Sequence, residues 1–432
     1  MSFGIPVRNG LAVGLLASTF LSSLRIGGRP AMFLNFIGTN SLDSRVTFTR
    51  ATTATFVDSN GLIQSAAINA PRFDYDPVTL APRGLLIEEQ RTNLLTYSEQ
   101  FDSAAYTNNN VTVTANATAA PDGTTTADLL TAASAASVNL QQSSAVAATS
   151  ATYGIFAKKS SGATQANTFR LRNTTTATTL VEVTINYDTG VLTYVTGSSG
   201  ATAVNFGNGW WRIVLTATTG ITSGNTIRCD QCFVGPATIG HNAFVWGAQL
   251  EAGAFATSYI PTVASTVTRN ADVAQMTGTN FSSWYNQSEG TFVVAFDRIA
   301  ALSPSFSGGL PRTLRVTDAG NANFFILSGN SGTGEQLLGR AAGADTVSIQ
   351  TGVQIAANTT AKESFAYRVN DFALSVNGAA PGADTSSANP SGMESIFLGD
   401  GATATRILNG HLRQLAYFNT RLPNATLQVL SA

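Results

Sequence analysis

The chain has 432 residues and a formal net charge of −1, a length that suffices for two or three domains. The balanced charge excludes the basic surface of a nucleic-acid-binding protein and a polybasic strip for anionic lipids, so neither nucleic acid nor a membrane is an expected partner. Only 11% of the residues are charged and 44% are apolar, and the Thr-, Ser-, Ala-, Asn- and Gly-rich remainder favours short strands and turns over helices.

An uncharged, largely apolar run, GLAVGLLASTFLSSL, occupies residues 10–24. It is shorter than the roughly 20 residues of a membrane-spanning helix, and no A-x-A cleavage site follows it. We therefore interpret residues 1–31 as an anchoring segment that buries its apolar face against another protein. A secretory signal or membrane segment is the first alternative, and a simple core segment is the second. The side chains expected to form the anchor are Ile5, Leu11, Val13, Leu15, Leu16, Phe20, Leu21 and Leu24.

Residues 32–95 contain short alternating strands separated by turn residues. The runs at 46–50, 54–58 and 61–66 alternate apolar and polar side chains, and Ser-Asn-Gly connects the last two. An irregular, proline-containing passage then leads into RGLLIEEQRTNLL at 83–95, which is rich in charge. We expect a small β-rich base and connector here.

Residues 96–262 show strand-like runs at the spacing of a sandwich. The turns between them include Asp188-Thr189-Gly190 and Gly207-Asn208-Gly209, and no helical pattern of useful length occurs. This block therefore predicts a β-sandwich of the jelly-roll kind. The runs are 111–115, 153–159, 169–173, 180–187, 191–196, 210–218 and 243–250.

Residues 270–432 again alternate, with Asn377-Gly378 as a tight-turn signal. They predict a second antiparallel sandwich that closes with a short helix within 421–431, capped by Asn424. The sequence as a whole therefore predicts an all-β protein, in which a small N-terminal base precedes two tandem sandwiches.

One segment, RGLLIEEQRTNLLTYSEQFD at 83–102, strongly resembles a stretch that recurs in bacteriophage virion proteins, where it leads from a base region into a carbohydrate-binding-like sandwich. The runs at 185–195, 208–216 and 245–262 resemble the later strands of the same module, so that the resemblance covers residues 83–262. The family includes tail-fibre and head-spike proteins. The C-terminal block is similar to concanavalin A-like or laminin G-like lectin folds, on DFALSVNG and GHLRQLAYFNTRL.

The end of the first sandwich module is predicted in more detail. AFVWGAQL would be its last core strand, with Val245 and Gly247 on the face opposite Trp246. GAFATSYIPT would then carry the chain back past the start of the module, and Pro261 would fix the backbone where the linker begins.

Aromatic side chains are the candidate ligand contacts, because a flat ring can stack on a sugar while amides and acids bind its hydroxyl groups. The alternative is that these rings fill the interior of the sandwich. The candidates are Tyr153, Tyr187, Tyr194, Trp210, Trp211 and Trp246.

Catalytic residues are not expected. Glycoside cleavage needs two carboxylates facing each other across a cleft, and the acids show no paired-strand signature. Glu88 and Glu89 lie next to Arg83 and Arg91 and are interpreted as structural ion pairs near a domain junction. Neither His241 nor His411 has a supporting nucleophile motif.

Metal sites and cofactors are not expected either. Cys229 and Cys232 lack a second ligand pair for zinc and the helix start that a redox motif requires. The laminin G resemblance would allow a calcium ion at the rim of the C-terminal block, with Asp318, Asp371 and Asp400 as the acids.

These observations predict a non-enzymatic structural appendage of a phage particle, located in the virion. It would bind other virion proteins through residues 1–31 and host polysaccharide through its sandwiches, as a homo-oligomer and by analogy with fibres a trimer. The alternatives are a capsule depolymerase, a secreted bacterial adhesin, and a purely architectural virion protein.

Overall fold

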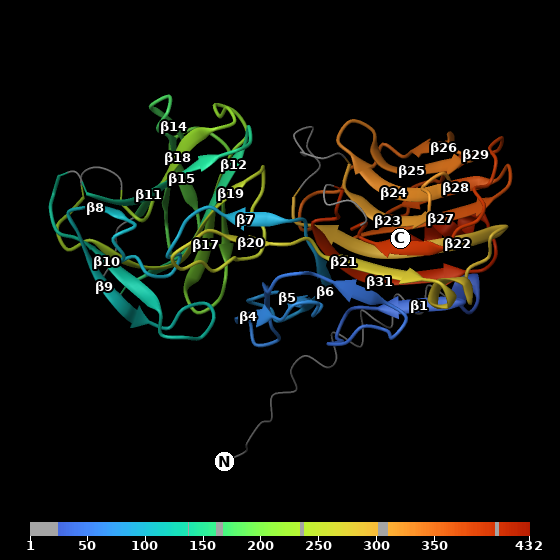
Figure 1. The fold of residues 1–432 in the computed structure, drawn as a ribbon, viewed down its shortest axis with the longest axis horizontal. Helices are drawn as coiled ribbons and strands as arrows, with labels where there is room; N and C mark the ends of the chain where they lie inside the picture. The colour runs from blue at the N-terminus through green and yellow to red at the C-terminus, as the bar shows by residue number, and fades with distance from the viewer. Residues whose placement is uncertain (1–24, 137, 161–166, 234–236, 301–309, 402–405) are drawn as a thin grey trace, which may run out of the picture.

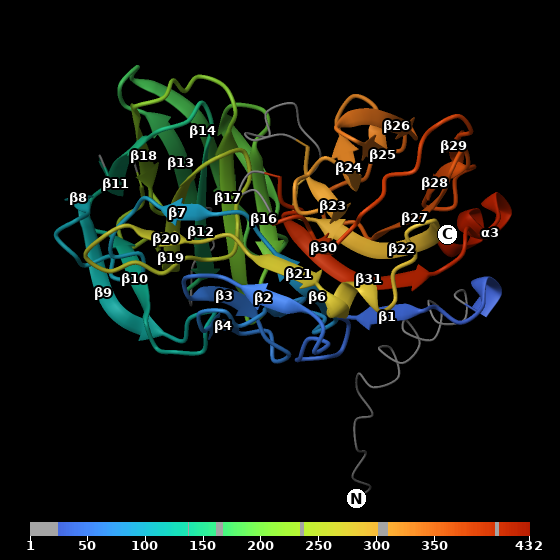
Figure 2. The ribbon, with the colours of Figure 1, turned by 45° about the vertical axis from the view of Figure 1, so that its right-hand side comes forward.

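The protein consists of two β-sandwiches, and the N-terminal strands lie along the lower side of the view in Figures 1 and 2. The computed structural model describes residues 25–136, 138–160, 167–233, 237–300, 310–401 and 406–432. All eight side chains of the expected anchor, from Ile5 to Leu24, lie outside the described residues. The prediction of an all-β fold built from antiparallel sandwiches is confirmed.

The first sandwich pairs two six-stranded sheets, which we call sheet 1 and sheet 2. Sheet 1 has the order β16-β17-β12-β19-β10-β9, and sheet 2 has the order β15-β14-β13-β18-β11-β8. Leu130 and Ile155 of sheet 1 pack against Phe169 and Leu171 of sheet 2 in a fully buried core. The strands are β8 (Thr107–Asn109), β9 (Val111–Thr118), β10 (Ala127–Ala132), β11 (Asn139–Val146), β12 (Ala151–Lys159), β13 (Asn167–Asn173), β14 (Thr178–Ile185), β15 (Leu192–Thr196), β16 (Ala201–Asn205), β17 (Trp210–Ala217), β18 (Asn225–Asp230) and β19 (Asn242–Ala252).

The second sandwich pairs an eight-stranded sheet 3 with a seven-stranded sheet 4. Phe292 and Phe365 of sheet 3 pack in one core with Leu314 and Phe325 of sheet 4. The strands of sheet 3 are β1 (Met32–Asn35), β5 (Phe73–Tyr75), β6 (Pro82–Ile87), β22 (Glu289–Arg298), β27 (Ala361–Arg368), β28 (Phe372–Val376), β29 (Gly382–Asp384) and β31 (Gly410–Phe418). Those of sheet 4 are β2 (Thr47–Thr49), β21 (Val273–Thr277), β23 (Arg312–Thr317), β24 (Phe324–Asn330), β25 (Gly334–Ala341), β26 (Ala344–Gln350) and β30 (Ser395–Leu398).

Short elements complete the described fold. They are the pairs β3 (Ala54–Val57) with β4 (Ile63–Ala66) and β7 (Arg91–Asn93) with β20 (Val267–Arg269), and the helices η1 (Arg25–Gly27), α2 (Thr279–Ser282) and α3 (Asn424–Leu430). Helix α3 covers the outer face of sheet 3 with Leu427 and Leu430. Asn424 is its first helical residue and not its cap, because Pro423 takes the N-cap position and no side chain caps the helix.

The predicted base at 32–95 does not form a core of its own. Strand β1 and strand β6 both pair with β31, and β2 pairs with β21, so these N-terminal strands complete the two sheets of the second sandwich. Ile63 of β4 instead packs on the outer face of sheet 1. Strands of three to six residues bury too little apolar surface to be stable alone, and their edges find partners in the larger sheets.

Strand β19 contains a β-bulge that the sequence pattern did not indicate. Val245 lies in the sandwich interior and Trp246 on the opposite face, as expected. Gly247 does not share the face of Val245: its φ is +67°, and a Cβ there would lie 3.0 Å from the Phe156 ring. The bulge restores the alternation, so that Ala248 and Leu250 point back into the interior.

Candidate functional site

The segments that carry the phage resemblance bind to each other at the junction of the two sandwiches. The side-chain amide of Asn93 donates to the carbonyls of Ala248 (3.0 Å) and Ile260 (2.9 Å). The hydroxyls of Ser98 and Tyr259 lie 2.6 Å apart, and the Thr262 amide donates to Ser98 Oγ at 2.9 Å. These bonds tie the start of the first sandwich to its exit, so the role of this motif is structural.

A buried ionic network lies beside this junction. Arg72 contacts Glu88 at 2.7 Å and also pairs with Asp272, while Arg50 contacts Asp272 at 3.0 Å and Arg269 pairs with Glu88. Burial alone would raise the pKa of Glu88, but the two guanidinium groups and hydrogen bonds from Ser258 lower it to about 2. Glu88 is therefore a permanently ionised structural group, in agreement with the interpretation of its sequence neighbourhood.

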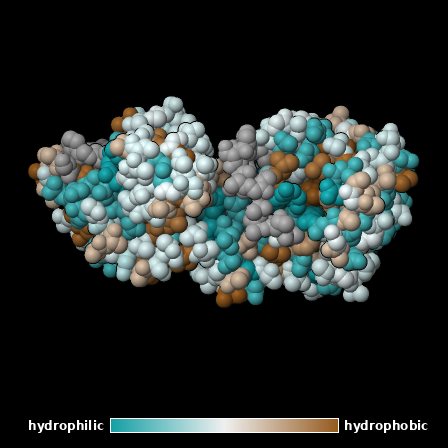
Figure 3. Space-filling view, turned by 45° about the horizontal axis from the view of Figure 1, so that its top comes forward, coloured by the Kyte–Doolittle hydropathy of each residue, from teal (hydrophilic) through white to brown (hydrophobic). Residues whose placement is uncertain are grey.

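A cavity of about 490 Å³ lies between the sandwiches, and we call it the inter-sandwich cleft. Three partly exposed rings line it: Phe56 of β3, Tyr75 of β5 and Phe206, which follows β16. Arg212 of β17 and Asn358 add polar groups. In the space-filling view a waist separates the two lobes, and hydrophilic residues lie beside it (Figure 3). Rings combined with a few polar groups are suited to hold a sugar.

The guanidinium of Arg212 lies at the outer face of sheet 1. Arg212 on β17 lies opposite Phe156 on the neighbouring strand β12, and its Cζ lies 5.6 Å from the centre of the Phe156 ring. Nη2 donates to the carbonyl of Thr257 at 2.6 Å, whereas the buried Nε has no hydrogen-bond partner among the described residues. Burial lowers the pKa of Arg212, although an arginine remains charged near neutral pH.

His411 also lines the cleft, held between two carboxylates. Its Nδ1 lies 2.7 Å from Asp297 Oδ1 and its Nε2 lies 3.0 Å from Asp74 Oδ2. Burial alone would lower the pKa of His411, but Asp297 and Asp74 outweigh this effect and raise it to about 9. The imidazole is therefore protonated at neutral pH and bonded on both sides.

The acids in the cleft are committed to internal partners. Asp74 accepts bonds from His411 and from the backbone amide of Val57 (2.7 Å), and Glu88 belongs to the ionic network. A glycosidase acid needs a raised pKa and access to the glycosidic oxygen, but the pKa of Glu88 is lowered. The arrangement can bind and orient a ligand, and neither lining acid is placed for proton transfer.

No protein-family model matches the sequence, and no curated protein is significantly similar to it. Among solved structures, the chain is similar to the CBM40 module of the Ruminococcus gnavus IT-sialidase, at 12% identity and a TM-score of 0.29, over 35% of this chain and 88% of that one. It is similar to the NanB sialidase of Streptococcus pneumoniae at 15% identity and a TM-score of 0.28, over 37% of this chain and 26% of that one. The LG1-3 region of the laminin alpha2 chain matches at 10% identity and a TM-score of 0.25, over 68% and 66% of the two chains. The matched part is thus about a quarter of NanB, and at these values the similarities assign no function.

None of the six aromatic candidates lines the cleft. Tyr153 is fully buried inside the first sandwich, and Trp210 and Trp246 are buried in a cluster on the outer face of sheet 1. These three rings therefore have no face available for a ligand. Their burial follows from packing: Ile63 and Tyr259 join the two tryptophans in that cluster and cover the sheet.

The remaining three candidates are partly buried against the core of the first sandwich. Trp211 donates from Nε1 to the carbonyl of Tyr187 at 2.9 Å, and Tyr194 accepts from the Ala201 amide at 2.9 Å. Their positions brace strands β14 to β17. Tyr187, Tyr194 and Trp211 thus pack against the core of the first sandwich.

Sequence reasoning missed the cleft residues Phe56, Tyr75, Phe206 and Arg212. The first three lie in or next to three separate local strand pairs, β3–β4, β5–β6 and β16–β17, so nothing local indicated a shared cavity. One signal was available for Arg212, which is the single charged residue in the otherwise uncharged strand WWRIVLTA.

The acids suggested for calcium do not converge. Asp318 accepts from the Asn323 side chain (2.8 Å), Asp371 pairs with Arg421 (2.8 Å), and Asp400 pairs with Arg312. Within the described ranges, no group of three or more His, Cys, Asp and Glu side chains could hold a metal ion.

The two cysteines are free and buried, and burial raises the pKa of both thiols. Asn167 donates to Cys232 Sγ at 2.9 Å. Because the reactive form of cysteine is the thiolate, buried thiols with raised pKa values are expected to be unreactive. In the part of the chain that the structure describes, we also found no helix of the length and hydropathy needed to cross a membrane.

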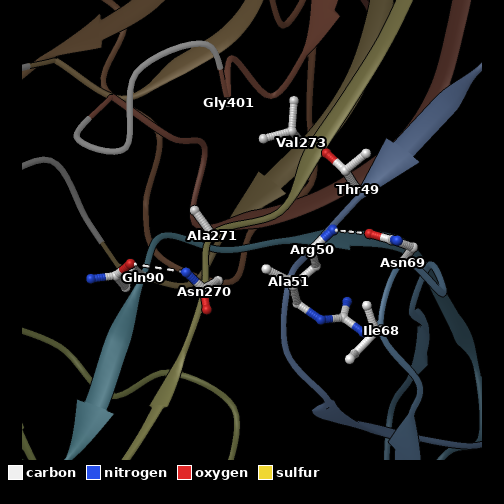
Figure 4. A pocket seen from close by; sticks show the side chains of 10 residues that line it. All are labelled: Thr49, Arg50, Ala51, Ile68, Asn69, Gln90, Asn270, Ala271, Val273 and Gly401. Atoms are coloured by element: carbon white, nitrogen blue, oxygen red, sulfur yellow. Dashed lines mark hydrogen bonds between the residues drawn. The ribbon is translucent and has the colours of Figure 1, made fainter.

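A second, open hollow of about 500 Å³ lies next to the ionic network (Figure 4). Its polar groups satisfy one another: the Arg50 amide donates to Asn69 Oδ1 at 3.0 Å, and Asn270 Nδ2 donates to Gln90 Oε1 at 3.3 Å. Because these groups already have partners, we assign no ligand to this hollow.

Proposed function

We propose that this protein is a non-enzymatic structural appendage of a bacteriophage particle, a head-spike or tail-fibre component, that holds host-surface polysaccharide. The observation that carries the binding role is the inter-sandwich cleft, in which the rings of Phe56, Tyr75 and Phe206 lie near Arg212 and Asn358. The phage assignment rests on the resemblance of residues 83–262. In this role the expected anchor at residues 1–31 attaches the protein to capsid, portal or tail proteins.

The commitment of Asp74 and Glu88 to internal partners supports binding without cleavage. Weak binding suffices on a particle, because many copies convert weak sites into useful avidity. Homo-oligomerisation, with a trimer as the first expectation, would add to that avidity. No cofactor is required for this task.

The decisive experiment incubates the purified full chain with envelope polysaccharide of the host and measures both binding and polysaccharide chain length. Binding without shortening is the expected result. Shortening would replace the proposal with a depolymerase. Absence of binding to every glycan tested, together with particles that lose stability when the protein is deleted, would replace it with an architectural role.

The anchoring role has its own test. Native protein from particles is sequenced from its N-terminus, and a variant lacking residues 1–24 is tested for incorporation. We expect an uncleaved start and loss of the variant from particles. A cleaved start, or normal incorporation of the variant, would contradict the anchor and favour a secreted adhesin.

A further inference from the structure

Arg212 is a cleft-lining guanidinium without a carboxylate partner. Among the described residues no acidic oxygen lies within ion-pair distance of it, whereas the buried Arg72, Arg269 and Arg298 each have one. Its one hydrogen bond to another described residue runs from Nη2 to the Thr257 carbonyl. The buried Nε is unbonded in all four of these arginines, so the missing carboxylate is what distinguishes Arg212. Arg212 is half-buried, and a partly desolvated charge without an opposite charge beside it is unfavourable, so its presence at a cavity requires an explanation.

The nearest acids do not pair with Arg212 because each is already bonded to another group. Glu251 accepts from the Thr257 amide (3.0 Å) and from its hydroxyl (2.5 Å). Glu88 is held by the arginines of the ionic network, and Asp74 by His411. These carboxylates favour the charged form of Arg212 from a distance but leave its Nε–H unbonded.

Arg212 lines the inter-sandwich cleft, which has a volume of about 490 Å³. Gly154 of β12 lies beside the guanidinium, where a Cβ would be in van der Waals contact with Nε and Nη2 at 3.8 Å. Phe156 packs beside Arg212, and Phe206 contacts that ring edge-on at 4.9 Å between centroids. A guanidinium held in one plane by a ring and a carbonyl is suited to bind a carboxylate through two parallel N–H groups.

We propose that the inter-sandwich cleft selects acidic glycans, and that Arg212 binds the carboxylate of a uronic-acid-type sugar whose ring packs on Phe206 and Tyr75. This inference rests on the proposed glycan-binding function and names its ligand class.

The test measures binding of the full chain to oligogalacturonate and hyaluronan oligosaccharides, each beside its neutral methyl ester, by titration calorimetry at low salt. At least one acidic oligosaccharide should bind about tenfold or more tightly than its ester, since charge-assisted bonds are roughly twice as strong as neutral ones. Acetate is the third ligand, and it separates a glycan site from a site for any carboxylate. Acetate that binds as tightly as the oligosaccharides would overturn the proposal.

Two variants link the selectivity to Arg212. R212Q should abolish the preference for the acid over the ester, and R212K should reduce it. In V204E, a carboxylate enters at a 44% exposed position directly opposite Arg212 on β16, so that it occupies the guanidinium without removing it. V204E should also abolish the preference, and it keeps the test valid if R212Q fails to fold. R340Q, at a surface pair with Asp345, is the matched control and should leave the preference unchanged.

The outcomes separate this inference from the function on which it rests. Equal affinity for acid and ester, or an unchanged preference in both R212Q and V204E, overturns acidic selectivity. If only neutral host polysaccharide binds, the selectivity is overturned and the glycan-binding function stands. If no glycan of either kind binds, both are overturned.

Discussion

His411 shows how two neighbouring carboxylates decide the charge of one buried side chain. Asp74 of β5 and Asp297 of β22 contact its two ring nitrogens, and Arg413 of β31 lies 3.8 Å from Asp297. The folded state therefore binds the imidazole proton more tightly than the unfolded chain does, with a pKa raised from 6.5 to about 9. Burial and the two acids have opposite effects, and the acids prevail.

This shift predicts a pH-dependent free energy of unfolding. A raised folded-state pKa contributes stability that is fully present below pH 6.5 and is lost as the pH rises through about 9. The contribution is about 3 kcal/mol at most, from 1.36 kcal/mol per pKa unit. Urea unfolding from pH 6 to 9.5 should show this decline in the natural protein and in the control H241Q, whereas H411Q should lack it. An undiminished decline in H411Q would contradict the assignment.

Glu363 presents the opposite case, an acid kept neutral. It is fully buried in β27, and in the part of the chain that the structure describes neither carboxyl oxygen accepts a hydrogen bond. Burial, and then the charge of Glu335, raise its pKa well above the usual range. Arg298 pairs instead with Glu335 at 2.5 Å, so the single buried cation of this group is already used.

Replacing Glu363 should therefore stabilise the protein. An acid with a raised folded-state pKa costs stability as the pH rises above its unfolded value near 4.5, so E363Q should gain at pH 7 and show no gain at pH 4. We expect a gain of about 1 kcal/mol, because an amide side chain is neutral at pH 7 without taking up a proton. Chemical denaturation at both pH values checks this. E335Q is the matched comparison and should destabilise, because it breaks the pair with Arg298.

At the scale of elements, the exit from β19 depends on one close approach. Gly253 has a φ of +134°, and a Cβ there would overlap with the guanidinium of Arg91. Arg91 donates to the carbonyl of Ala252, lies 4.6 Å from the centre of the Phe255 ring and pairs with Glu89 at 2.6 Å. The glycine thus lets the connector at residue 91 cross the end of the first sandwich.

G253A should therefore lower stability by about 2–4 kcal/mol, since it combines an unfavourable backbone with a steric overlap. G224A provides the control, because Gly224 also has a positive φ (+91°) but has open space around its Cβ position. G224A should lower the free energy of unfolding by only about 1 kcal/mol. Thermal unfolding of both variants measures the difference. Equal losses of stability in G253A and G224A would contradict the role of the close contact between Gly253 and Arg91.

How far the sequence predicts these elements depends on whether their information is local. The runs of apolar side chains located β12, β17 and β31 well, because each strand packs into a core, and β12 and β31 do so with both faces. Pairing partners carry no local signal, so the sequence did not show that β1 and β6 complete a sheet with β31. The same holds for the cleft, whose lining comes from both sandwiches and the strands beneath them.

Aromatic residues show the limit of composition as a guide to function. Two adjacent tryptophans drew attention as ligand contacts, yet both are used for packing, Trp210 under the exit segment and Trp211 against Tyr187. Sequence alternation places Trp210 and Trp211 on opposite faces but does not tell which faces other elements cover. The less conspicuous Phe56 and Tyr75 line the cleft instead.

At the scale of the whole molecule, one ionic network connects the two sandwiches. Glu88 directly follows β6 of the second sandwich and accepts bonds from the amide and hydroxyl of Ser258, at 2.7 Å each, in the exit of the first. Arg72, Arg269 and Asp272 complete its shell with almost no solvent exposure. Separating the two sandwiches would break these ion pairs and leave buried charges without partners. The two sandwiches should therefore unfold together.

E88Q tests this coupling, because it keeps the shape of the side chain and removes the charge that Arg72 and Arg269 share. Removing one partner of a buried ion pair typically costs about 3–5 kcal/mol. Calorimetry should show one unfolding transition in the natural protein and two in E88Q, since the link between the sandwiches is weakened.

K159Q is the control for this prediction. It removes an exposed pair with Asp188, in which the side chains are 37% and 72% exposed, and should change stability by about 0.5 kcal/mol or less. A single transition and a loss below about 1 kcal/mol in E88Q would mean that the two sandwiches unfold together without the network.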